Sequence, residues 1–248
     1  MLYSATMTAD PASLRSLDVP IPPPEIRYRI VNAEIDDTYF LQSGQLCAAE
    51  ILRKLADAGI DAHGFRNVLD FGCGCSRILR FLIPHLPQAA FSGCDIDEVA
   101  IEWSRKNIPG TRFAVVPHLP PTAYGPAQFD FVYALSVFTH LDLPRQILWL
   151  DELRRTLCPG GLLLLTVQGA VAYEIVEPTL DQKRRDEFEA IGFLFLENIP
   201  DRVLPDWYQT AIYKEHFARH VFQSGFSVLR YEARGMTNWQ DLLLLRKT

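Results

Sequence analysis

The sequence predicts an α/β fold, in which helices cover both faces of a mostly parallel β-sheet. Two observations support this prediction. From residue 67 to residue 167, short apolar segments of strand length alternate with amphipathic segments and short loops, which is typical of strand–helix–strand units with parallel strands. The apolar segments, such as Leu162–Val167, are continuous runs, as expected of strands that are buried on both faces.

The first expected element is a helix over residues 37–58. Phe40, Ile51 and Leu55 fall on one apolar stripe at helical spacing, and Gly59 follows the last turn. The helix is therefore expected to pack against the sheet through that stripe.

The other elements follow in chain order. Pro84 is expected to end the helix after the first strand, because proline lacks the N–H that a helix interior needs. Asp97 is expected to cap the next helix. Strands are expected at residues 67–71, 89–95, 111–116, 129–135, 162–167, 226–231 and 240–246, and helices at residues 76–83, 97–106, 143–157 and 215–223.

Two segments fall outside this alternation. Residues 1–36 are expected to be an irregular, Pro-rich leader, partly mobile or laid over the surface, because Pro20 and Pro22–Pro24 impose an extended path. Residues 37–248 are interpreted as one domain. Within it, residues 170–213 break the rhythm, with a charged stretch followed by aromatic residues. We interpret them as an insertion that carries its own helix and forms a lid.

The composition excludes several classes. The 248 residues are 48% hydrophobic and 22% charged with a net charge of −6, so a full core is expected without disulfides. No basic patch points to nucleic acid, no run is long enough to span a membrane, and no signal peptide precedes residue 20. Five cysteines without a disulfide spacing favour the cytoplasm. The oligomeric state is not readable from the sequence.

A glycine turn follows the first strand. Phe71 runs into Gly72-Cys73-Gly74, and Asp95 ends the next strand, where a carboxylate of a nucleotide site accepts hydrogen bonds from ribose. A plain strand–helix turn is the alternative. NAD is a weaker candidate, because Ser76 replaces the third glycine and Asp70 would repel a pyrophosphate. A cofactor that carries an ammonium group suits Asp70 better.

Four motifs resemble those of class I S-adenosylmethionine-dependent methyltransferases. They are VLDFGCG at 68–74, SGCDID at 92–97, FDFVYALSVFTHL at 129–141 and LCPGG at 157–161. The resemblance covers residues 37–170 and 214–248. It implies a three-layer, Rossmann-like sheet of seven strands, mostly parallel with the last strand antiparallel, together with an N-terminal helical extension and a lid-like insertion. It also implies S-adenosyl-L-methionine as the cofactor.

The resemblance assigns roles to individual residues. Asp70 would face the methionine end of the cofactor, Asp95 the ribose hydroxyls, and Ile96 the adenine. The segment 117–119 would contact the adenine edge, and the segment 134–136 would meet the methionine end. The full set of expected cofactor-binding residues is Tyr39, Asp70, Phe71, Gly72, Cys73, Gly74, Asp95, Ile96, Pro117, His118, Leu119, Ala134, Leu135 and Ser136.

Three residues are candidates for taking a proton from the methyl acceptor. His140 follows the fourth strand, while Tyr208 and His216 belong to or follow the insertion. For the latter two, a small satellite core under a long loop is an equally good interpretation. Cys73, Cys75 and Cys94 do not have the spacing of a zinc site, so no metal is expected.

The function predicted from the sequence is therefore S-adenosylmethionine-dependent methyl transfer to an oxygen or nitrogen of a small-molecule acceptor. Two alternatives stay open: a non-catalytic protein that binds S-adenosylmethionine, and an NAD-dependent oxidoreductase.

Overall fold

The computed structural model describes residues 14–31, 36–196 and 209–248. The chain divides into two compact units, Met1–His118 and Leu119–Thr248. Each unit contributes strands to the mixed seven-stranded sheet that the sequence predicts.

The first unit contains three parallel strands in the order β3-β2-β1. They are β1 (Asn67–Phe71), β2 (Ala90–Asp95) and β3 (Arg112–Val115). The helices of this unit are α1 (Pro24–Val31), α2 (Asp37–Asp57), α3 (Leu79–His85) and α4 (Glu98–Asn107), with a short 3-10 turn η2 (Ala62–Gly64). Asp97 caps α4, as predicted, by accepting from the backbone N–H groups of Val99 and Ala100.

The prediction that residues 1–36 are irregular is wrong for the segment 24–31, which forms α1. Pro24 is the first residue of this helix, a position where the missing N–H costs nothing and the fixed φ favours the helix. Ahead of α1, residues 14–20 lie against α3. The buried guanidinium of Arg80 donates to the carbonyl of Val19 at 2.7 Å and to the Ser16 hydroxyl at 3.0 Å.

The predicted end of a helix at Pro84 is also wrong, because α3 continues through Pro84 to His85. A proline inside a helix leaves the carbonyl four residues earlier without its N–H partner. That carbonyl belongs to Arg80, and the backbone N–H of Leu17 donates to it at 2.8 Å. The leader therefore supplies the hydrogen bond that the proline removes. The helix also starts at Leu79, three residues later than expected.

The second unit contains four strands in the order β4-β5-β9-β8. They are β4 (Phe129–Ala134), β5 (Leu157–Val167), β8 (Phe226–Met236) and β9 (Gln240–Lys247). β9 runs antiparallel to both β5 and β8, which confirms the predicted antiparallel last strand. Two helices accompany these strands, α5 (Leu143–Thr156) and α8 (Glu215–Phe222).

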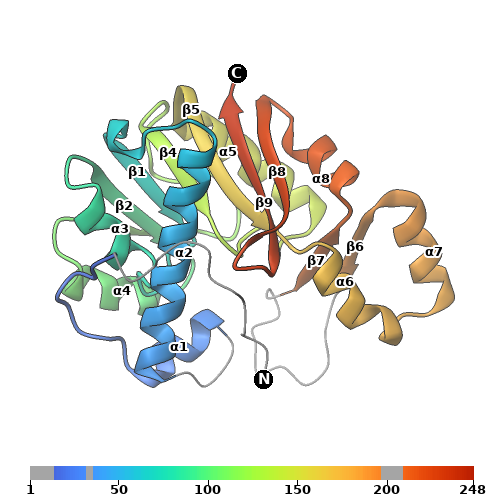
Figure 1. Cartoon of the computed structure of the whole chain (residues 1–248), viewed down its shortest axis with the longest axis horizontal. Coiled ribbons are helices and arrows are strands. Elements are labelled where there is room, and N and C mark those ends of the chain that lie inside the picture. The colour runs from blue at the N-terminus through green and yellow to red at the C-terminus, as the bar shows by residue number, and fades with distance from the viewer. Residues whose placement is uncertain (1–13, 32–35, 197–208) are drawn as a thin grey trace. The chain divides into compact units, whose positions relative to one another are not determined.

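The insertion holds more structure than the single helix predicted. Its described elements are α6 (Ala170–Val176), a 3-10 turn η3 (Glu177–Thr179), α7 (Gln182–Ile191), β6 (Phe193–Leu196) and β7 (Thr210–Tyr213) (Figure 1). β6 and β7 form an antiparallel pair. A small cluster of its own, with Tyr173 stacked on Phe188 at a ring distance of 4.2 Å, stabilises the insertion.

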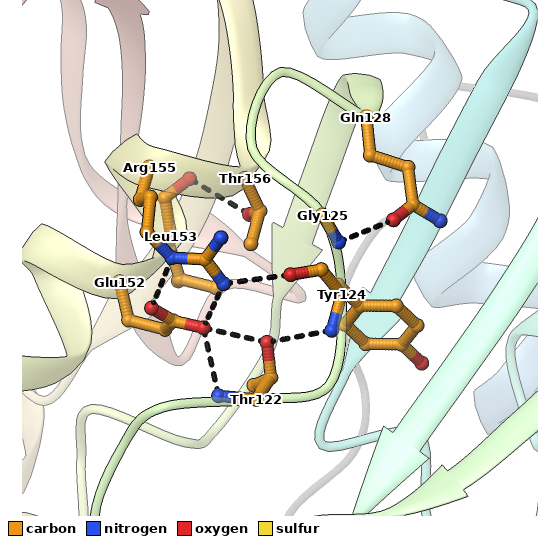
Figure 2. A network of polar contacts seen from close by, with 8 residues as sticks. All are labelled: Thr122, Tyr124, Gly125, Gln128, Glu152, Leu153, Arg155 and Thr156. Carbon is orange, nitrogen blue, oxygen red and sulfur yellow. Dashed lines mark hydrogen bonds and ion pairs between the residues drawn. The ribbon is translucent and has the colours of Figure 1, made fainter.

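The loop between β3 and β4 is fastened to α5 by hydrogen bonds to an ion pair within that helix. Figure 2 shows the carboxylate of Glu152, on α5, beside the Arg155 guanidinium and the hydroxyl and N–H of Thr122. Arg155 also donates to the Tyr124 carbonyl at 2.8 Å. Glu152 is only 5% exposed, and its hydrogen bond from Arg155 lowers the pKa of the carboxyl to about 2.

Among the described helices, none combines the length and the apolar character that crossing a membrane requires.

Candidate cofactor site and reaction loop

The turn after β1 adopts a backbone that requires glycine. Gly72 and Gly74 have φ values of +83° and +50°, in the left-handed region that favours glycine. The N–H groups of Gly72 and Cys73 both donate to the Cys94 carbonyl, at 2.8 and 3.0 Å. The turn is thus fixed to the end of β2.

Asp95 lies at the end of β2, as predicted, and its carboxylate holds two loops together. One oxygen accepts from the Gly74 N–H at 2.7 Å, and the other accepts from the Asp97 N–H at 2.9 Å. Burial raises the pKa of the Asp95 carboxyl, while these N–H donors lower it. Because a carboxylate has about four acceptor sites, it retains capacity for two hydroxyl donors, as binding to a ribose requires.

Ser76, which stands in place of a third glycine, is also in the left-handed region, with φ of +62°. Its hydroxyl donates to the Ser104 hydroxyl at 3.0 Å, and both side chains are fully buried. Ser104 on α4 lies 3.5 Å from the Gly74 carbonyl. Serine at this position therefore fastens the turn to α4 through hydrogen bonds.

The thiols near the turn are buried packing groups. Burial raises the pKa of Cys75 to about 12, and it raises the pKa of Cys73 well above its ordinary value, with Asp70 adding to that effect. Metal binding and nucleophilic chemistry both need the thiolate. At neutral pH these two side chains therefore stay protonated.

The helix α2, drawn in blue in Figure 1, packs closely on the glycine turn. A Cβ added to Gly44 would lie 2.2 Å from the Arg77 carbonyl oxygen, so the two backbones touch. Phe40 from the same helix is fully buried in a cluster with Cys75 of the turn. Tyr39, the candidate contact on α2, is 37% exposed beside it.

The other predicted residues of the first unit fall into two groups. Asp70 and Phe71 are buried at the end of β1, 2% and 3% exposed. Ile96 is half-buried, and Pro117 and His118 are exposed after β3. The structure thus leaves the adenine candidates open to solvent and buries Asp70 beneath the turn.

In the second unit, the predicted segment 134–136 follows directly from β4. Ala134 is buried, while Ser136 is exposed with φ of +59°. The Ser136 N–H donates to the Thr166 hydroxyl at 2.8 Å, and the Gln240 amide donates to the Ser136 hydroxyl at 2.9 Å. Leu119 begins this unit and is 48% exposed.

His140 lies in the loop between β4 and α5. Its Nδ1 is 2.7 Å from the Gln209 carbonyl oxygen. A carbonyl only accepts, so this contact assigns the proton to Nδ1 and leaves the lone pair of a neutral ring on Nε2. A backbone hydrogen bond joins the same two segments: the Ala211 N–H of β7 donates to the Thr139 carbonyl at 2.8 Å. The insertion therefore positions the loop that carries His140.

Gln146, on α5, is a positioning residue that sequence reasoning missed. It is fully buried, and its amide donates to the Leu141 carbonyl at 2.6 Å, one residue after His140. A lone buried glutamine within an amphipathic helix carries no pattern that would identify it. The loop that carries His140 is thus held from α5 on one side and from β7 on the other.

Of the last two catalytic candidates, His216 and Tyr208, the structure describes only His216. His216 is exposed on the first turn of α8, and its ring lies against Gly192, where an added Cβ would be 2.7 Å from it. This contact packs α8 on the end of α7. Tyr208 lies outside the described residues.

Comparisons with known proteins agree with these motifs. Residues 69–163 match the family described as Methyltransferase domain. A curated relative, trans-aconitate 2-methyltransferase of Rhizobium leguminosarum bv. trifolii, is 31% identical over 110 residues, which are 43% of this chain. The chain thus matches only 40% of the length of that protein.

Solved structures agree with the fold. An S-adenosylmethionine-dependent methyltransferase from Clostridium acetobutylicum superimposes with a TM-score of 0.58 at 12% identity, covering 90% of this chain and 96% of the other. A second, from Methanosarcina mazei, gives 0.54 at 18% identity, covering 73% and 92%. The matches confirm the predicted Rossmann-like methyltransferase fold and the family resemblance, and the family indicates S-adenosylmethionine as its cofactor.

Proposed function

We propose that this chain, whose residues 69–163 form a methyltransferase domain of the class I kind, transfers the methyl group of S-adenosylmethionine to an oxygen or nitrogen of a small-molecule acceptor. The observation that supports it best is the carboxylate of Asp95. It is fixed by the N–H groups of Gly74 and Asp97 at the end of β2, where a nucleoside ribose binds in sheets of this type.

The residues at the turn fit this cofactor. Gly72 and Gly74 carry no Cβ that would keep a ligand away from the backbone of the turn. Asp70, buried at the end of β1, supplies a negative charge suited to the ammonium group of the methionine end. Ile96 offers an apolar, half-buried side chain for the adenine face. When bound, S-adenosylmethionine supplies an electrophilic methyl group on a sulfonium.

The chain's own contribution to the reaction is positioning. Methyl transfer is a direct displacement, so most of the acceleration comes from holding the acceptor in line with the methyl group, an effect of about 7–11 kcal/mol in well-oriented systems. The loop that carries His140 follows the carboxyl end of β4, the edge of an α/β sheet at which ligands bind. We assign the acceptor to that edge.

His140 is the proposed proton acceptor. In a neutral ring Nε2 is the basic nitrogen, because Nδ1 faces the Gln209 carbonyl. A hydroxyl or amine acceptor must lose a proton during methylation, and a neutral imidazole can take it. A carboxylate acceptor has no proton to lose, so its methylation would not depend on His140.

The proposed acceptor class is taken from the name of the curated relative. The curated relative is named for methylation of trans-aconitate, a polycarboxylate, so small organic acids are the first acceptors to test. Hydroxyl and amine compounds of similar size form the second group. The cytoplasm is the proposed location, where such compounds and the cofactor are available.

The test combines binding and turnover. Calorimetry of the full chain should show binding of S-adenosylhomocysteine and no comparable binding of NAD. Incubation with S-adenosylmethionine and each acceptor should then release S-adenosylhomocysteine for at least one of them. Binding without turnover across both acceptor groups would favour a non-catalytic binding protein. Binding of NAD in place of S-adenosylhomocysteine would overturn the proposal.

A further inference from the structure

Arg234 lies at the edge of the second unit's sheet at which ligands of α/β sheets bind. β8 and β5 are both antiparallel to β9, so they run in the same direction. β4 is parallel to β5, and the carboxyl ends of β4, β5 and β8 therefore meet at one edge, the edge that binds ligands. Arg234 is two residues from the end of β8. It brings a cation to the edge from which the loop with His140 extends.

The backbone of Arg234 is strained and firmly held. Its φ is +55°, in the left-handed region that costs a residue with a side chain free energy. Its N–H donates to the Asp241 carboxylate at 2.8 Å. Asp241 is 5% exposed and also accepts from the Tyr231 hydroxyl. Strained residues that the surrounding structure maintains are concentrated at functional sites. The buried carboxylate thus fixes the point from which the Arg234 side chain extends.

The same carboxylate joins the β8–β9 hairpin to the insertion. A Cβ added to Gly169, the residue ahead of α6, would collide with the Asp241 carboxylate, so the start of the insertion packs directly on Asp241. Further along α6, Glu174 forms an ion pair with the Arg234 guanidinium at 3.8 Å. The cation therefore lies where the hairpin and the insertion meet.

The ion pair with Glu174 is one that a ligand can replace. Its N–O distance of 3.8 Å is longer than a hydrogen bond, and the side chains of Arg234 and Glu174 are 48% and 66% exposed. Exposed ion pairs of this kind contribute little to stability. A guanidinium, in contrast, binds a carboxylate of suitable geometry through two parallel N–H donors. A carboxylate on a ligand can therefore take the place of Glu174 at small cost.

Two neutral groups accompany this cation at the same edge. Ser136 follows β4 and Gln240 begins β9, and the Gln240 amide donates to the Ser136 hydroxyl at 2.9 Å. A hydroxyl and a carboxamide orient polar groups of a ligand by hydrogen bonds, but they supply no positive charge. Arg234 supplies the charge, so the edge fits an acceptor that carries an anionic group.

We propose that Arg234 binds a carboxylate of the methyl acceptor that does not itself react. It thereby selects acceptors that carry a carboxylate besides the group that is methylated. This inference rests on the proposed function and narrows its substrate class. Arg234 is a specificity-determining residue in this scheme, because it holds a part of the acceptor remote from the methyl group.

The first experiment measures binding without turnover. Trans-aconitate, citrate and fumarate are titrated by calorimetry into the full chain saturated with S-adenosylhomocysteine. At least one of them should bind, and Arg234→Gln should weaken its binding about tenfold or more, the usual loss for a hydrogen-bonded charged group. The affinity for S-adenosylhomocysteine should stay unchanged. Arg234→Lys, which keeps the charge, should restore part of the affinity for the acid.

The second experiment measures turnover. In Arg234→Gln the KM of the bound acid should rise about tenfold with kcat nearly unchanged, because a carboxylate that does not react is held equally before and during methyl transfer. Crotonate is the matched acceptor for fumarate, since a methyl group replaces one of the two carboxylates. Wild type should prefer fumarate to crotonate in kcat/KM, and Arg234→Gln should reduce that preference.

Two control variants test whether the effect belongs to Arg234. Arg154→Gln removes another cation of an exposed ion pair, the pair with Asp151 at 3.2 Å. Arg154 lies against Gly225, just ahead of β8 and thus at the opposite end of that strand, so no loss is expected. Glu174→Gln removes the competing carboxylate and keeps the cation, so it should retain or raise the affinity for the acid.

The outcomes are distinct. Equal affinity of wild type and Arg234→Gln for the acid would overturn the inference. An equal loss in Arg154→Gln or Glu174→Gln, or a parallel loss of S-adenosylhomocysteine binding, would overturn it as well. A wild-type chain that binds S-adenosylhomocysteine but none of the three acids would also overturn it and would leave the proposed function to hydroxyl and amine acceptors. If the wild-type chain does not bind S-adenosylhomocysteine, the proposed function itself fails.

Discussion

Gly44 of α2 and Arg77 of the glycine turn are in backbone contact: a Cβ on Gly44 would lie 2.2 Å from the Arg77 carbonyl oxygen. Real Cβ atoms do not approach an oxygen that closely, so the helix and the turn are docked through a glycine. The glycine turn is therefore held by α2 as well as by β2.

The first prediction concerns this contact. Gly44→Ala should lower the free energy of unfolding by about 1–3 kcal/mol, since an added methyl group must push α2 off the turn. It should also weaken binding of S-adenosylhomocysteine. Gly64→Ala is the matched control, because nothing lies within 4 Å of its added Cβ. Urea unfolding measures both; equal stability of the two variants would contradict the contact.

The second prediction concerns Asp95. Asp95→Ala should weaken binding of S-adenosylhomocysteine by about 1–3 kcal/mol, the cost of leaving ribose hydroxyls unpaired. Asp97→Asn, which keeps an acceptor at the N-cap of α4, is the control and should bind normally. Unchanged affinity in Asp95→Ala, measured by calorimetry, would show that the ribose assignment is wrong.

A third prediction is a pH dependence of the same site. Burial raises the pKa of the Asp95 carboxyl above its ordinary value of 3.8, and the protonated form is the poorer acceptor for hydroxyl groups. Affinity for S-adenosylhomocysteine should therefore fall as the pH drops through that raised pKa, at higher pH than for an ordinary aspartate. Calorimetry at stepwise lower pH checks this, provided that circular dichroism shows a folded chain at each step.

The fourth prediction concerns the ion pair of Figure 2. The hydrogen bond from Arg155 holds the pKa of Glu152 at about 2, against an ordinary 4.5. A lowered carboxyl pKa contributes stability above the ordinary value, and this stability is lost as the pH falls towards 2. Glu152→Gln should cost about 1–3 kcal/mol at pH 7. The difference from wild type should shrink between pH 4.5 and 2; a constant difference would contradict the assignment.

The fifth prediction concerns His140. His140→Asn should lower the rate at least tenfold with a hydroxyl or amine acceptor, because it removes a base whose usual effect is about 10²–10⁴-fold. It should leave methylation of a carboxylate acceptor and the affinity for S-adenosylhomocysteine nearly unchanged. Gln146→Leu, which frees the loop, should reduce the rate with both acceptor classes. Equal rates of wild type and His140→Asn with a hydroxyl acceptor would remove His140 from the mechanism.

Much of the fold could be predicted because its signals are local. The strand Asn67–Phe71 begins and ends where its apolar run does, and Asp97 caps α4 through its own side chain. The left-handed turn at Gly72 and Gly74 and the position of Asp95 at the end of β2 were also predictable, because both signals lie at a fixed interval in the sequence. That these residues bind the cofactor stays a prediction.

The errors came from contacts between distant residues. Pro84 stays inside α3 because Leu17, far away in the sequence, donates to the carbonyl that the proline leaves open. Arg234 gave no signal, because a single arginine near the end of a strand becomes notable only when the fold brings Asp241 and Glu174 beside it. The contact of His140 with Gln209 joins residues 69 positions apart, which no spacing rule connects.

The backbone hydrogen bond from Leu17 to Arg80 also bears on where a shortened chain can begin. The methyltransferase motifs begin at residue 68, and a shortened chain starting at residue 37 would contain all of them. Such a chain would leave the Arg80 carbonyl and guanidinium without the partners that residues 16–20 provide. We therefore expect that a chain without residues 16–20 is less stable than the full chain, although those residues carry none of the motifs.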